Sequence, residues 1–228
     1  MRSRSSSLVL GFLAAGCVAG GSPPIDASSC VASSDGDLQG LASQERVDCV
    51  IEITGTELET LNALSGLQSA SGFILTDNAL LRDVTALSAL EPFRVFSAQG
   101  TPLSADLDLT PAHGDIYLAG SDVESLTGEQ VSAAVVSISE NHALTSLSFP
   151  QLEEVDSLVI DDNPNVAGLL AGFPSLTSAA QLSVQNAARV PVTEIQALAV
   201  QAGVPIGGLV HCGNADDEPC DDLQDLDW

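Results

Sequence analysis

Short runs of β-branched and other apolar residues recur along the chain at a nearly constant spacing. They occupy residues 50–53, 72–75, 94–97, 115–118, 135–138, 157–160 and 181–184. Their last residues follow one another by 22, 22, 21, 20, 22 and 24 positions. Such a period over seven units is typical of a solenoid, in which each unit buries its apolar edge against the next.

Alternation within each run predicts which side chains face the core. The last residue and the residue two places earlier share one face of a strand. These pairs are Ile51/Ile53, Phe73/Leu75, Val95/Ser97, Ile116/Leu118, Val136/Ile138, Leu158/Ile160 and Leu182/Val184. All members except Ser97 are apolar, so this face is predicted to point inward.

The turn after each run carries a second signal. An apolar residue returns five or six places later, as Leu58, Leu81, Leu103, Val123, Leu144, Val166 and Val190. Asn precedes it in several units, as Asn78, Asn141 and Asn163, with Asn186 one place early. Asn suits such turns because its amide satisfies free backbone groups and it tolerates the left-handed conformation.

The residue just before the end of each run is predicted to point outward. In three adjacent units this residue is Ile74, Phe96 and Tyr117, which would stack about 5 Å apart. An outward apolar stripe in a chain with only 4% aromatic residues is a candidate contact patch for a protein or glycan. Two alternatives stay open: another segment covers the stripe, or the register slips by one residue there.

The first segment has the form of an export signal. Arg2 and Arg4 precede a short apolar stretch, 8–15, that is too short to span a bilayer. The sequence Leu-Ala-Ala-Gly-Cys that ends at Cys17 resembles the lipobox of bacterial lipoproteins, although Ala14 stands where that family prefers Leu. The resemblance implies cleavage before Cys17 and acylation of this residue. An ordinary secretory signal with an incidental Cys is the alternative.

Charge narrows the function classes. The chain has 31 Asp and Glu against 6 basic residues, all of them Arg, for a net charge of -25. Loss of residues 1–16 removes two Arg and no acid, which gives -27. This charge excludes a nucleic-acid binder, and the lack of Lys excludes a P-loop or a Schiff-base enzyme. Disorder is not indicated, because 45% of the residues are hydrophobic.

Four cysteines remain if Cys17 is acylated. They form a pair at each end of the predicted folded region, Cys30 with Cys49 and Cys212 with Cys220. An even number in an exported protein indicates disulfides. Of the three possible connectivities we favour this local pairing, because a rod of repeats keeps its two ends far apart.

The end of the chain is predicted to close the repeat. Residues 193–196 fit a capping box before a helix over 194–202, which Gly203 and Pro205 would terminate. Residues 206–212 can add a last strand.

Signals of catalysis are weak. The three histidines, His113, His142 and His211, are isolated, and neither an HExxH nor a GxSxG motif occurs. Acidic clusters such as Asp35-Gly36-Asp37 do not continue into an EF-hand loop. We therefore expect no catalytic residues, no cofactor and no metal site; a weak cation site in the acidic turns or tail stays open.

The repeat resembles leucine-rich-repeat solenoids, and more closely the receptor L domain family. The matching pattern is apolar-x-apolar-x-x-Asn-x-x-Leu, as in residues 73–81, and the pair Cys30 and Cys49 resembles that family's N-terminal cap. The resemblance covers roughly residues 30–220. It implies a repeat solenoid, mainly β with short helices, in which parallel strands form a right-handed coil of seven to eight repeats. That family is a binding scaffold without catalytic residues.

These observations give one expected organisation. It comprises a signal peptide (1–16), a lipidated Cys with a flexible tether (17–29), a disulfide cap (30–49), the solenoid (50–190), a C-terminal helix and last strand (191–213) and an acidic tail (214–228).

The expected function is recognition or adhesion by a non-catalytic envelope lipoprotein. We expect a monomer anchored by its lipid, in the outer membrane of a Gram-negative bacterium. Its expected partner is a neutral or cationic protein or glycan, and not a nucleic acid. The alternatives are a surface-coat lipoprotein without a specific ligand and a β-solenoid enzyme that acts on polysaccharide.

Overall fold

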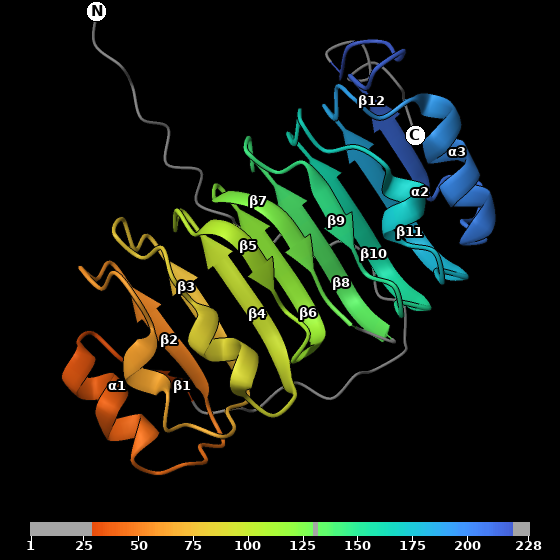
Figure 1. Ribbon diagram of the computed structural model, residues 1–228. Helices are drawn as coiled ribbons and strands as arrows, with labels where there is room; N and C mark the ends of the chain where they lie inside the picture. The colour runs from red at the N-terminus through yellow and green to blue at the C-terminus, as the bar shows by residue number, and fades with distance from the viewer. Residues whose placement is uncertain (1–28, 130–131, 221–228) are drawn as a thin grey trace, which may run out of the picture.

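The computed structural model describes residues 29–129 and 132–220 and is mainly β. Nine parallel strands form one large sheet, in which sequence order is also spatial order (Figure 1). They are β1 (Ser29–Val31), β2 (Val50–Thr54), β3 (Gly72–Thr76), β4 (Phe93–Gln99), β6 (Ala112–Ala119), β8 (Ser132–Ser139), β10 (Glu154–Asp161), β11 (Ser178–Gln185) and β12 (Leu209–Cys212). This arrangement is compatible with a solenoid-like fold, as the period of about 22 residues predicts.

The segments between these strands form a second wall. It contains a smaller parallel sheet of β5 (Ser104–Asp108), β7 (Asp122–Thr127) and β9 (Ser146–Ser148). Its helices are α1 (Asp35–Ala42), η1 (Asn62–Leu64), η2 (Thr85–Ala89), α2 (Leu169–Gly172) and α3 (Val192–Gln201). The helices all lie on one side of the large sheet (Figure 1). The sequence had not predicted the smaller sheet.

The core lies between the two walls. The inward strand residues predicted from alternation are buried in every strand except β4, and the apolar residues after the turns, from Leu58 to Val190, are buried as well. Phenylalanines are among its largest side chains, and Phe149 and Phe173 stack with ring centroids 5.4 Å apart. The apolar pattern therefore predicted most of the core correctly.

Strand β4 corrects the predicted register. Val95 and Ser97 were expected to face inward, but Phe96 and Ala98 do so, with 0% and 1% of their surface exposed. A β-bulge between Phe93 and Val95 is the cause. Phe93 and Phe96 are three residues apart and would point to opposite faces of a regular strand. The extra residue at the bulge lets both rings enter the core.

The turn after each strand of the large sheet from β2 to β12 has the same conformation. In every case the residue two places after the last inward residue of the strand has positive φ. These residues are Gly55, Asp77, Gly100, Gly120, Glu140, Asp162, Asn186 and Gly213. The next residue is buried in each turn, and four of these buried residues are Asn78, Asn141, Asn163 and Asn214. The left-handed residue turns the chain so that this side chain points into the fold.

These asparagines connect neighbouring units. The Asn78 amide donates to the Ile53 carbonyl at 2.8 Å, and its Oδ1 accepts the Thr56 backbone N–H at 3.0 Å. Where Asn is missing from the pattern, Thr101 and Ser121 fill the position. The Thr101 hydroxyl accepts from the Asn78 N–H, and the Ser121 hydroxyl donates to Asn141. Asn186 comes one place early because it is the left-handed residue of its turn, and Ala187 takes the buried position.

Both predicted disulfides are present. Cys30 pairs with Cys49, and Cys212 pairs with Cys220. The first disulfide encloses helix α1, whose N-cap Ser34 accepts the Asp37 N–H. Each bridge therefore fastens one end of the nine-stranded sheet.

The predicted capping box of helix α3 is wrong. The helix begins earlier, at Val192, with Pro191 at the N-cap and no capping side chain of its own. Asp216, from beyond the last strand, instead accepts the Val192 N–H at 2.7 Å. Glu194 accepts the Leu170 N–H and so links α3 to α2.

Candidate binding face

The large sheet has an outer face that points away from the second wall. Alternation places every second residue of each strand there. Pairing of the strands aligns one residue from each into a central row: Val31, Glu52, Ile74, Ser97, Tyr117, Ser137, Val159, Ser183 and Val210. Strands lie about 4.8 Å apart, so this row is about 40 Å long.

The outer face carries little charge. Glu52 is the only charged member of the central row. The row two places later along the strands contains Thr76, Gln99, Ser139 and Gln185 together with a single acid, Asp161. The row two places earlier also contains a single acid, Asp115. Hydroxyl, amide and aliphatic groups therefore dominate this surface, although the net charge of the chain is -25.

Tyr117 is the one aromatic side chain of the central row. It is 39% exposed and lies between Ser97 and Ser137 of the adjacent strands. Partial burial and the nearby charge of Asp115 raise the pKa of its phenol. Asp115 itself accepts backbone N–H groups from Ala134 and Val135 at 3.1 and 2.9 Å. Tyr117 therefore offers a neutral ring and hydroxyl to a partner.

The predicted stripe of Ile74, Phe96 and Tyr117 is broken at its centre. Phe96 is completely buried, and Ser97 takes the outward position between Ile74 and Tyr117. Ile74 and Tyr117 do lie in one row, two strands apart. The sequence signal for the bulge was that Phe93 and Phe96 are three residues apart. In a regular strand these two rings would point to opposite faces, and a bulge is needed for both to face the core.

Asp161 is the least satisfied acid of the outer face. Its neighbours in register are Ser139 and Gln185, and its Oδ1 is buried without a hydrogen-bond partner among the described residues. Burial, followed by the charge of Asp162, raises the pKa of this carboxyl. No sequence signal singles out Asp161, because it is one of many acids in turns and at strand ends.

A groove of about 280 Å³ lies on the second wall, between η2 and β5. Its three carboxylates are engaged in local contacts. Asp83 accepts the Thr85 N–H at 2.8 Å, Asp108 accepts the Thr110 N–H at 2.9 Å, and Asp106 accepts the Ser125 hydroxyl. Arg82 at its edge pairs with Asp122. These acids make local contacts and do not form a free acid–base pair.

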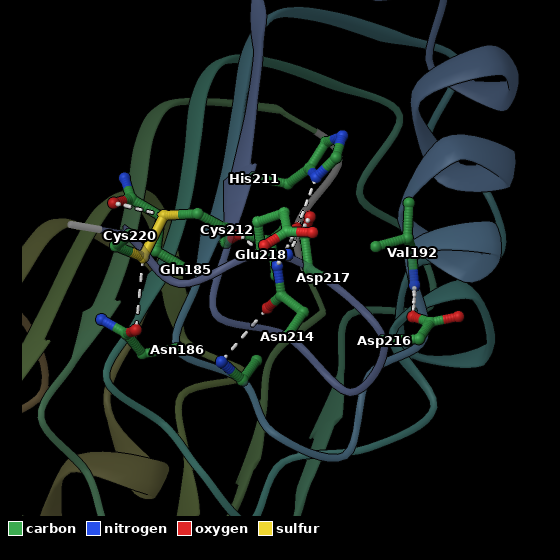
Figure 2. Close-up of polar contacts among 12 residues, drawn as sticks. Gln185, Asn186, Val192, His211, Cys212, Asn214, Asp216, Asp217, Glu218 and Cys220 are labelled. Atoms are coloured by element: carbon green, nitrogen blue, oxygen red, sulfur yellow. Dashed lines mark hydrogen bonds and ion pairs between the residues drawn. A yellow bond between two sulfur atoms is a disulfide. The ribbon is translucent and has the colours of Figure 1, made fainter. Parts of the chain in front are cut away.

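The acidic segment expected to begin at Asn214 contacts the fold as far as Cys220. Asn214 donates to the Val184 carbonyl at 2.9 Å. Asp217 lies 2.6 Å from the ring of His211 (Figure 2). Burial opposes ionisation of Asp217, but hydrogen bonds from His211 and Asn214 outweigh it and lower the pKa of this carboxyl. His211, one of the three isolated histidines, thus lies half-buried on strand β12.

The structure does not test the predicted lipidation site. Cys17 and residues 18–28 of the predicted tether lie outside the described residues, and the last residue of that tether, Ser29, belongs to strand β1. Within residues 29–129 and 132–220, no group of three or more His, Cys, Asp and Glu side chains is placed to hold a metal ion. No helix of the described part is long and apolar enough to cross a membrane.

Comparisons with protein-family models, with curated proteins and with solved structures found no match to this chain.

Proposed function

We propose that this chain is a non-catalytic lipoprotein of the bacterial cell envelope that recognises a partner with the outer face of its large sheet. Acylated Cys17 would hold it at the membrane, through a short tether that ends near strand β1. The partner would be a neutral or cationic protein or glycan, because an anionic polymer would be repelled by the chain's overall charge.

One observation carries the proposal: an almost uncharged face about 40 Å long on a strongly acidic protein. Acidic side chains on the other surfaces favour solubility. If the sheet face had no role except solubility, we would expect it to carry as many acids as those surfaces do. Serine, glutamine and tyrosine side chains on this face offer neutral hydrogen-bonding groups, while Ile74, Val159 and Tyr117 add apolar area. This composition suits a partner that brings its own polar and apolar groups.

The finer fold is part of the same proposal. The sheet order, the period of about 22 residues and the repeated left-handed turn support a right-handed coil of seven to eight repeats, like that of receptor L domains and leucine-rich repeats. In such a coil the strands present a continuous surface, and the side chains of several units act together on one ligand.

Binding to an array of glycans and capture of envelope proteins test the function. The exported chain is compared with variants Tyr117→Ala and Val159→Glu, which alter the central row. We expect one partner class to be retained by the wild type and lost, at least tenfold (about 1.4 kcal/mol), in both variants.

Leu80→Ala is the matched control, because Leu80 is 48% exposed but lies in a turn and not on the sheet face. It should bind as the wild type does. Retention of no partner would favour a surface-coat role without a specific ligand. Cleavage of a polysaccharide on the array would favour the enzyme alternative.

A further inference from the structure

A second apolar surface lies at the C-terminal end of the fold. It is a groove of about 590 Å³ between helix α3 and the turn that leads into β12. Its apolar lining includes Ala199, Val200, Val204, Pro205, Ile206 and Leu209, and no charged residue lines it. Val200 is 83% exposed, and the side chain of Ile206 is fully exposed.

The exposure of Ile206 follows from a tight turn. Gly208 N–H donates to the Pro205 carbonyl at 2.9 Å, and Gly207 between them has φ 86°. Ile206 therefore sits at the tip of a four-residue turn, a position that polar residues usually take. An isoleucine there loses the stabilisation of burial unless another apolar group covers it.

The chain provides such groups within reach. Cys220 is fixed beside the C-terminal end of β12 by its disulfide to Cys212, as Figure 2 shows. Eight residues with the sequence DDLQDLDW follow, and they include Leu223, Leu226 and the only tryptophan, Trp228. Eight residues reach up to about 27 Å, whereas the four residues of β12 extend over only about 10 Å between their first and last Cα atoms.

We propose that residues 223–228 dock in this groove, with Leu223, Leu226 and Trp228 against Val200 and Ile206. Residues 223–228 are covalently joined to the fold through Cys220, so the contact is intramolecular and a weak apolar interaction is sufficient. The two aspartates of this segment, Asp225 and Asp227, would face solvent, because the groove has no charged lining. A second copy of the chain is a less suitable occupant, since each copy carries a charge of -25 and the two repel one another.

The fluorescence of Trp228 in the full chain tests this directly. In the docked state, its emission lies at shorter wavelength than that of a free peptide of residues 221–228, and acrylamide quenches it less. Ile206→Ser and Val200→Ser should each shift the emission toward that of the peptide. Both side chains are exposed, so neither change should unfold the protein, which circular dichroism checks.

Val31→Ser is the matched control, because Val31 is 72% exposed at the opposite end of the sheet. It should leave the emission unchanged. A wild-type emission equal to that of the free peptide would overturn the proposal. So would a blue shift that disappears on dilution together with a dimer seen by light scattering, because the occupant would then be a second copy.

Discussion

Single buried amides connect the units of this protein. Asn163 illustrates the case: its Nδ2 donates to the carbonyls of Ile138 and Asp161, both at 2.8 Å, and its Oδ1 accepts the Asn141 N–H at 3.1 Å. The side chain is completely buried, so no water replaces these bonds. Stability at this position depends on hydrogen bonds as much as on apolar contact.

Asn163→Ala should therefore lower the free energy of unfolding by about 3 kcal/mol, because it leaves buried backbone groups unpaired at about 1–3 kcal/mol each. The control is Asn165→Ala in the same turn, which removes an exposed hydrogen bond to the His142 carbonyl and should cost about 0.5 kcal/mol. Urea denaturation of both variants measures the difference. Equal losses would contradict the role of the buried amide.

Asp161 gives a pH-dependent prediction. The pKa of its carboxyl is raised in the folded state above its ordinary value of 3.8, so the folded state binds the proton more tightly than the unfolded state. This contribution is most favourable at low pH and is lost as pH rises from about 3.8 through the raised pKa.

Asp161→Asn removes this effect. The variant should gain stability relative to the wild type as pH rises through that window, and the gain should be constant above it. The carboxyl is partly exposed, so solvent screening keeps the gain small. Denaturation of both proteins between pH 3 and pH 8 gives the difference, and a difference that does not depend on pH would contradict the account.

At the scale of elements, the bulge in β4 decides which side chains are available for binding. Phe96→Ala should destabilise the protein by about 3–5 kcal/mol, because it leaves a cavity in the core. Tyr117→Ala, on the outer face of the adjacent strand β6, should cost about 1 kcal/mol or less. Thermal or urea unfolding of the pair tests the register, and the reverse order of losses would show that Phe96 points outward.

Much of the element pattern was predictable from the sequence, for identifiable reasons. Strands β3 and β10 followed period two over their predicted inward pairs, Phe73/Leu75 and Leu158/Ile160, so these faces were predicted correctly. Strand β4 did not, because a bulge shifts the face without changing the composition. Helix α3 begins earlier than its local motif indicates, because Asp216 caps it from a distant part of the chain.

The candidate face itself was only partly predictable. Ile74 and Tyr117 were correctly placed in one outward row, and Ser97 was not. The low charge of the whole face depends on which residues align across nine strands, and the bulge moved one strand by one residue. Most acids of the described residues lie elsewhere, in turns and loops and on the second wall.

At the scale of the whole molecule, the proposal depends on a lipid anchor. Cys17→Ser should abolish labelling of the protein with a radioactive fatty acid and release it from the membrane fraction. Globomycin should cause the uncleaved precursor of the wild type to accumulate. Normal acyl labelling of the Cys17→Ser variant, or secretion of an unlabelled wild type, would contradict the anchor.

The proposed function makes the outer face the surface that meets a partner. Ser137 on β8 lies in the central row, whereas Ser146 on β9 is exposed on the second wall. The two are the same residue type, both lie on strands, and they belong to opposite walls. They are therefore matched positions for a photo-reactive amino acid.

Photo-cross-linking in intact cells, with a benzoylphenylalanine at Ser137 or at Ser146, is the most direct test of recognition by the outer face. We predict a discrete cross-linked product from position 137 and none from position 146. A product from position 146 alone, or no product from either position, would contradict recognition by the outer face.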